Sequence, residues 1–156
     1  MLVAFVGSRH LKGHALTTAL NVLSSLPSCA TPQTGCCPSG LDRAVRTWCT
    51  AQGRPLQVFQ ALSQAPAVLR ARTIQLVQAS NLVLSFPVSP SPIRSGSWLA
   101  VWSAVRAGVP VLVHLPGALL AALPCLVGVT GWQAAALSFC PSVPFLRPLI
   151  PQTSLF

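Results

Sequence analysis

Glycine, serine and arginine occur together in three short stretches of this 156-residue chain. The stretches are Gly7-Ser8-Arg9, the segment from Gly35 to Arg46, and Arg94-Ser95-Gly96-Ser97. Small residues let backbone N–H groups approach an anion closely, a serine adds a hydroxyl, and an arginine adds a planar fork that matches phosphate. Each stretch alone could be an ordinary tight turn, but the three together predict loops that bind phosphate groups.

The second stretch contains Asp42, the only acidic residue of the chain. A carboxylate in the first turn of a helix is stabilised by the helix dipole by about 0.3–1 kcal/mol, and this is one explanation for its presence. A neutral Ser or Asn cap does nearly as well, so helix stabilisation is a weak reason for keeping a single acid. The other explanation is a role in a pocket, as an acceptor for a ribose hydroxyl, for a base edge, or for a backbone amide that shapes the pocket.

The charge balance of the chain is strongly basic. Ten Lys and Arg residues, nine of them arginine, stand against Asp42, and the formal net charge is +9. Such a balance suits a polyanionic partner, above all a nucleic acid. A GC-rich coding sequence would also favour arginine, but it would not explain the missing carboxylates.

The composition otherwise indicates one apolar domain. The chain is 52% hydrophobic and only 7% charged, whereas average soluble domains have roughly 25% charged residues. Its length is that of one domain with a substantial core. The poorly charged surface also predicts buried interfaces, either in a homo-oligomer or in a larger protein assembly.

The sequence predicts neither a metal site nor a cofactor. The cysteines show no CxxC spacing and have no histidine close by, and His10 and His14 lack a third ligand. The loops contain neither a P-loop motif nor a complete GxGxxG, so ATP hydrolysis and a dinucleotide cofactor are not expected.

Nor does the sequence predict a membrane span or a secretory signal. Residues 107–146 carry no formal charge, but prolines divide this region into pieces that are shorter than a bilayer-spanning helix. The first ten residues have no basic region and no long apolar run, unlike a signal peptide. We therefore expect a cytoplasmic protein with reduced thiols.

Apolar runs and helical periodicity alternate along the first two thirds of the chain. Short strands are expected at 2–6, 55–61, 81–87 and 109–116, and residues 28–35 are expected to form a loop with room for a short strand near 29–30. Helices are expected at 14–26, 41–51, 65–80 and 97–107. This alternation predicts an α/β fold, a Rossmann-like parallel sheet flanked by helices, with ligands at the carboxyl ends of the strands.

Periodicity is weaker in the last forty or so residues. Residues 118–129 and 132–139 are compatible with a final helix and strand, and the stretch from Pro144 onward is broken by prolines. We therefore divide the chain into a Rossmann-like core, 1–117, and an irregular apolar C-terminal extension, 118–156, which packs on the core or on a partner.

The order of these motifs resembles the DprA/Smf (DNA-processing protein A) family and the wider SLOG group of Rossmann-like nucleotide-binding proteins. The resemblance covers residues 1–117. It rests on five motifs in order: Gly7-Ser8-Arg9, Thr34 to Asp42, Arg70 to Ile74, Arg94 to Ser97, and Leu115-Pro116-Gly117. It implies binding of single-stranded nucleic acid or a nucleotide-like ligand.

The loops and the resemblance together give a set of candidate ligand-binding residues. They are Gly7, Ser8, Arg9, Gly35, Ser39, Gly40, Asp42, Arg43, Arg70, Arg72, Arg94, Ser95, Gly96 and Ser97. The chain departs from the family pattern at Cys36 and Cys37, which replace a glycine and an alanine and which we interpret as small loop-filling residues. The accessory domains of full-length DprA are absent, so recombinase loading is not inferred.

Two pairs of residues have more than one interpretation. Arg70 and Arg72 are two apart and lie on different faces of the expected helix, so at most one is expected to point into the site without help. Trp98 and Trp102 are four apart on one helix face, where they could stack on bases or belong to the core or an oligomer interface.

Two alternative functions remain open. The related LOG branch consists of phosphoribohydrolases that release a base from a nucleoside monophosphate, and this reaction needs a carboxylate near the developing positive charge. The glutamate of that branch would fall at about Ala100, which leaves Asp42 as the only acid available and favours binding over catalysis. The other alternative is a non-catalytic protein-interaction subunit with a degenerate pocket.

Overall fold

The computed structural model describes residues 1–117, 123–124 and 126–150. Five strands and four helices alternate along the first part of this region, which confirms the predicted α/β class. The second strand lies at 31–35, where a loop was expected, because the pairing with the first strand overrides the weak strand preference of the sequence TPQTG. The strands are β1 Leu2–Gly7, β2 Thr31–Gly35, β3 Gln57–Phe59, β4 Leu82–Phe86 and β5 Val111–Val113. The helices are α1 Gly13–Ser24, α2 Gly40–Ala51, α3 Pro66–Gln78 and α4 Gly96–Ala107.

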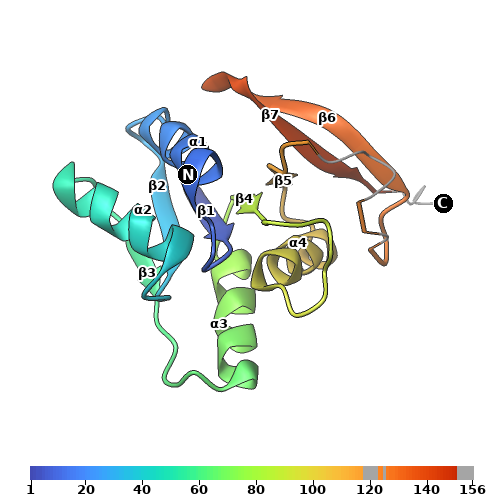
Figure 1. Cartoon of the computed structure of the whole chain (residues 1–156), viewed down its shortest axis with the longest axis horizontal. Coiled ribbons are helices and arrows are strands. Elements are labelled where there is room, and N and C mark those ends of the chain that lie inside the picture. Colours follow the sequence, from blue (N-terminus) through green and yellow to red (C-terminus); the bar gives the residue numbers. More distant parts are fainter. Residues whose placement is uncertain (118–122, 125, 151–156) are drawn as a thin grey trace.

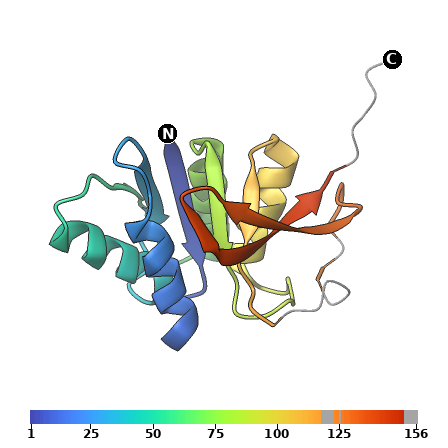
Figure 2. The same ribbon diagram turned by 90° about the horizontal axis from the view of Figure 1, so that it is seen from above.

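These strands form the parallel part of a seven-stranded sheet with the order β3-β2-β1-β4-β5-β7-β6. β1 is central and pairs in parallel with both β2 and β4, while β3 and β5 pair in parallel on the outside. Helices α1 and α2 cover one face of the sheet, and α3 and α4 cover the other (Figures 1 and 2). This is the Rossmann-like arrangement that the alternation of elements predicted.

Strand β1 shows why an unbroken apolar run was informative. Val3 and Phe5 belong to the core beneath α1 and α2, whereas Ala4 and Val6 belong to the core beneath α3 and α4. Successive residues of a strand point to opposite faces, so a strand that is covered on both sides must be apolar at every position. The position of β1 in the middle of the sheet follows from this composition.

The C-terminal extension is more regular than predicted. Strands β6 (Gly131–Leu137) and β7 (Cys140–Leu149) form an antiparallel hairpin, and β7 pairs with β5 through Val113 and Leu146. The prolines of β7 led us to predict an irregular tail. Proline ends a helix, but its fixed φ is compatible with an extended strand. Residues 118–122, 125 and 151–156 lie outside the described residues, and the final helix that was expected after residue 117 falls largely on them.

The hairpin belongs to the same core as the parallel strands. Phe145 of β7 is buried and makes an edge-on contact with Phe86 at the end of β4, with ring centroids 6.0 Å apart. His114, which directly follows β5, is also buried, and its Nδ1 lies 2.8 Å from the carbonyl oxygen of Pro144. Within the described ranges, no helix is long and apolar enough to cross a membrane.

The cysteines of the core and the surface are expected to differ in reactivity. Burial raises the pKa of the Cys49 thiol on the inner side of α2, and the nearby charge of Arg54 opposes this effect only in part. Cys29 is exposed. Because the thiolate is the reactive form, iodoacetamide near neutral pH should modify Cys29 in the folded protein and reach Cys49 only when the protein opens. Peptide mapping by mass spectrometry checks this, and equal rates at the two residues would contradict it.

Candidate functional site

The two central strands of the sheet lead to helices on opposite faces. The chain leaves β1 toward α1 on one face, and it leaves β4 toward α4 on the other. Loops that diverge in this way leave a crevice at the carboxyl ends of the strands, where open α/β sheets bind their ligands. A cavity of about 1100 Å³ lies there, lined by both of these loops, the end of β2, and helices α3 and α4.

Most of the candidate residues lie together around this cavity. Those that line it are Gly7, Ser8, Arg9, Gly35, Asp42, Arg70, Arg72, Arg94, Ser95, Gly96 and Ser97. Arg70 and Arg72 both do so, although the helix periodicity suggested that at most one would. The two long side chains leave different faces of α3, but the cavity is wide enough to receive both.

Three of the candidate residues do not line the cavity. Ser39 and Arg43 are exposed at the start of α2. Gly40 has a φ of +62°, and a Cβ there would overlap the carbonyl oxygen of Ser8 and the backbone of Arg9. Gly40 therefore acts indirectly, since it lets α2 begin directly against the first loop, where the Leu41 amide donates to the Ser8 carbonyl oxygen at 3.4 Å.

The loop before α4 is held in an unusual conformation. Arg94 has a φ of +52°, and among the described non-glycine residues it alone is in the left-handed region. The Ser95 hydroxyl caps the helix by accepting from the amide of Trp98 at 3.3 Å and lies 3.0 Å from the Ser97 hydroxyl. The first residues of α4, Gly96 and Ser97, therefore line the cavity together with Ser95 and the strained arginine, a combination that suits an anion.

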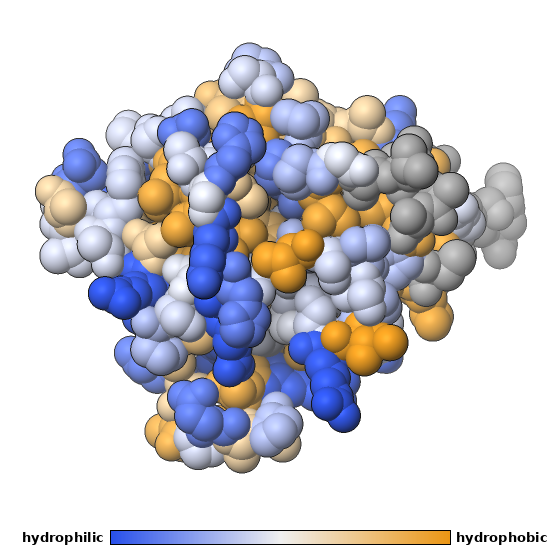
Figure 3. Space-filling view, in the orientation of Figure 1, coloured by the Kyte–Doolittle hydropathy of each residue, from blue (hydrophilic) through white to orange (hydrophobic). Residues whose placement is uncertain are grey.

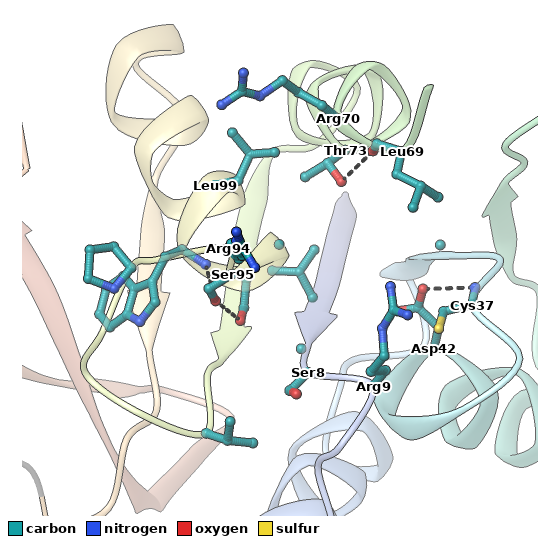
Figure 4. Close-up of a pocket in the computed structure, with 18 of the residues that line it drawn as sticks. Ser8, Arg9, Cys37, Asp42, Leu69, Arg70, Thr73, Arg94, Ser95 and Leu99 are labelled. Carbon is teal, nitrogen blue, oxygen red and sulfur yellow. Dashed lines mark hydrogen bonds between the residues drawn. The ribbon is translucent and has the colours of Figure 1, made fainter. Parts of the chain in front are cut away.

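Most of the arginines that line the cavity differ from several others in how far their side chains are already bonded. Arg46 and Arg54 are bonded to backbone carbonyls, and Arg72 is paired with Asp42. By contrast Arg9, Arg70 and Arg94 are exposed, and no hydrogen bond joins their side chains to the rest of the described chain; all three line the cavity. Figure 4 shows Arg9 on one side of the hollow and Arg70 and Arg94 on the other.

The surface around the cavity carries both hydrophilic and hydrophobic side chains. Figure 1 looks onto the carboxyl ends of the parallel strands, and Figure 3 shows the same side of the molecule. Hydrophilic side chains gather there in a band that runs from α1 toward α3, with hydrophobic side chains beside it (Figure 3). The cavity therefore opens on a face with both polar and apolar parts.

Asp42 lies in the cavity wall, but its oxygens are already engaged. Oδ1 lies 3.2 Å from the Thr34 hydroxyl, whose single proton is shared with the Phe5 carbonyl oxygen at the same distance. Oδ2 accepts from the Cys37 amide at 3.1 Å and from Nη1 of Arg72 at 3.2 Å. The bond to Cys37 is drawn in Figure 4. Of the roles considered from the sequence, the structure shows the carboxylate holding a backbone amide that shapes the pocket, and Asp42 also lies in the first turn of α2.

No protein-family model matches this chain, and neither does any curated protein or any solved structure. The case for a function therefore rests on the geometry of the site and on the resemblance of its motifs.

Apart from the two tryptophans, the apolar residues of the cavity were not identified from the sequence. Leu69, Leu99 and Trp102 line it together with Val88 and Ile93, whose side chains are exposed. The guanidinium of Arg106 lies 4.6 Å from the centroid of the Trp102 ring. No sequence signal could have found Leu69 and Leu99, because apolar side chains at helical spacing are expected of any buried helix face.

Trp98 has a different place from Trp102. It is buried, its Nε1 donates to the carbonyl oxygen of Ser89 at 2.8 Å, and its ring packs edge-on against Trp132 of the hairpin. Trp98 is thus a core residue that anchors the loop before α4. Both tryptophans line the cavity, but only Trp102 is partly exposed.

The described residues bring no three His, Cys, Asp or Glu side chains together in a group that could hold a metal ion. What the site offers is instead a set of cationic and hydrogen-bond-donating groups with an apolar side. Such a set can bind and orient a phosphate-bearing molecule.

Proposed function

We propose that this protein binds single-stranded nucleic acid or a nucleotide-like ligand, in the manner of the DprA-like proteins that its motifs resemble. The observation that carries the proposal is the convergence of Arg9, Arg70 and Arg94 on one cavity without partners among the described residues. Arginines with unused donors at the carboxyl edge of a parallel sheet are suited to phosphate oxygens, which they can bind bidentately.

The electrostatics of the cavity support a phosphorylated ligand. Its lining contains four arginines and one aspartate, which gives a net charge of +3. The only carboxylate is neutralised by Arg72, so it does not repel an approaching anion. Electrostatic attraction of this kind raises the association rate of charged ligands and makes binding dependent on salt.

The apolar side of the cavity supports a ligand that also carries bases. Leu69, Leu99 and the half-buried ring of Trp102 border the cavity beside the arginines. Bases stack on aromatic side chains, and such contacts contribute about 1–3 kcal/mol per base in single-stranded nucleic-acid complexes. Phosphate alone would need no such surface.

The hydrolase alternative is less well supported. Ala100, where the resemblance would place the catalytic glutamate, is fully buried in α4 against the sheet. Asp42 already accepts three hydrogen bonds, of the roughly four that a carboxylate can accept, and cannot easily serve as a general acid. We therefore propose a binding protein.

A salt titration tests the proposal. Binding of fluorescently labelled oligothymidylate should weaken as salt rises, with a slope of log affinity against log salt near −2 to −3 if three or four phosphates are contacted, at about −0.7 each. Competition by a nucleoside monophosphate distinguishes a small nucleotide from a strand as the preferred ligand. Absence of binding of either ligand at low salt, or an affinity that does not change with salt, would disprove the proposal.

A further inference from the structure

An ion pair joins the two helix layers at the edge of the cavity. Arg72 belongs to α3 on one face of the sheet, and Asp42 belongs to α2 on the other. Their contact, 3.2 Å between Nη1 and Oδ2, passes the carboxyl end of β2. The side chains are only 13% and 10% exposed, so solvent screens the pair far less than it screens a surface pair.

The carboxylate of this pair is fixed from several directions. Thr34 and the Cys37 amide donate to it, and Gly35 between them has no side chain, so the guanidinium lies directly against the backbone. A Cβ at Gly35 would overlap both Nη1 of Arg72 and Oδ2 of Asp42. Arg46 donates to the Cys37 carbonyl oxygen at 2.9 Å and holds the same loop from behind.

Only some of the N–H groups of the Arg72 guanidinium have hydrogen-bond partners. Nη1 donates to Asp42, and Nε is buried without a hydrogen-bond partner within the described residues. Nη2 likewise makes no hydrogen bond to these residues, but it is not among the buried atoms. Because Arg72 lines the cavity, Nη2 and the second N–H of Nη1 are the donors that remain for a ligand.

We propose that Asp42 is a positioning residue: it holds Arg72 in the cavity wall as a preorganised donor to a phosphate oxygen of the ligand. The inference rests on the proposed function and assigns a role within the same site. Arg9, Arg70 and Arg94 are free to move and must lose side-chain entropy when they bind. Arg72 has lost that freedom already, which makes its contact with the ligand more favourable.

Neutralising Asp42 distinguishes a positioning role from a purely electrostatic role, because the two predict changes of opposite sign in the affinity for the ligand. Asp42→Asn raises the net charge of the cavity lining from +3 to +4, so an electrostatic effect alone would tighten anion binding. If Asp42 positions Arg72, the same substitution weakens binding by about 10-fold. The hydrogen bond between Arg72 and the ligand phosphate is then either lost or formed at the cost of side-chain entropy.

The experiment measures the affinity of labelled oligothymidylate at low salt for the wild type, Asp42→Asn, Arg72→Met and the double variant. We expect Asp42→Asn to weaken binding in the wild-type background and to have no further effect beside Arg72→Met, which a general structural defect would not reproduce. Asp42→Glu keeps the charge but displaces the carboxylate, and should also bind more weakly. Thermal unfolding followed by circular dichroism verifies that each variant is folded.

The outcomes distinguish this inference from the proposed function. If the wild type does not bind the oligonucleotide, both are overturned. If Arg9→Gln weakens binding while folded Asp42→Asn or Asp42→Glu binds as tightly as the wild type or more tightly, only the positioning role is overturned. Arg72→Lys keeps the charge and loses the fork without altering the carboxylate, so an affinity equal to that of the wild type would overturn the role even if no Asp42 variant folds.

Discussion

Replacing Arg9, Arg70 and Arg94 together by glutamine is expected to reduce the affinity for oligothymidylate by at least about 100-fold at low salt. Each hydrogen bond from a charged donor contributes about 1.5–3 kcal/mol, and three such groups are removed from one cavity. The salt dependence should become shallower as well, by about 2 in the slope of log affinity against log salt, because three fewer phosphates are neutralised. Stability should hardly change, since these side chains are exposed.

The matched control removes the same charge elsewhere. Lys12, Arg43 and Arg147 are exposed and do not line the cavity. Replacing all three by glutamine lowers the net charge of the protein equally, so it corrects for the general attraction between a basic protein and a polyanion. A loss of affinity as large as that of the cavity variant would show that binding is spread over the whole surface, and the cavity would then have no special role.

Much of the fold could be predicted because the parallel sheet leaves a simple pattern. β1 is apolar at every buried position, and each of the four helices was expected within a few residues of its observed bounds. The hairpin was not predicted, because its residues are apolar without clear alternation and contain three prolines in β7. Its place in the sheet depends on contacts such as the pair Val113–Leu146, which are far apart in the sequence.

The site could be predicted to the level of its loops. Gly7-Ser8-Arg9 and the Arg94–Ser97 segment line the cavity because residues that follow parallel strands meet at one edge of the sheet. The partner of Asp42 could not be predicted in the same way. Arg72 lies 30 residues along the chain on the other face of the sheet, and only the tertiary fold reveals that the one acid of the chain is neutralised rather than presented to a ligand.

Gly35 is where this ion pair and the stability of the protein are most closely linked. Gly35→Ala is expected to lower the free energy of unfolding by about 2–3 kcal/mol, although the substitution adds only one methyl group. The atoms that the new Cβ would overlap are the ends of the Arg72 and Asp42 side chains. The overlap is therefore relieved when Arg72 swings out toward solvent, which separates the largely buried pair and leaves Asp42 with Thr34 and the Cys37 amide. Breaking a buried pair costs about 3–5 kcal/mol when a charge is left without any partner, and these two bonds reduce that cost.

Chemical denaturation of two pairs of variants tests this account of Gly35. Gly131→Ala is the matched control, because Gly131 also lies at the end of a strand with an ordinary φ, and its added Cβ would come no nearer than 3.6 Å to Leu149. It should change the free energy of unfolding by less than about 0.5 kcal/mol. In an Arg72→Ala background the guanidinium is gone and, of the atoms that the new Cβ would overlap, only Oδ2 of Asp42 remains. Gly35→Ala should then cost distinctly less, and the non-additivity identifies the guanidinium as the main cause. If Gly35→Ala lowers the free energy of unfolding equally in both backgrounds, the strand itself cannot accept a side chain at this position. The contact with Arg72 would then not be the reason for the glycine.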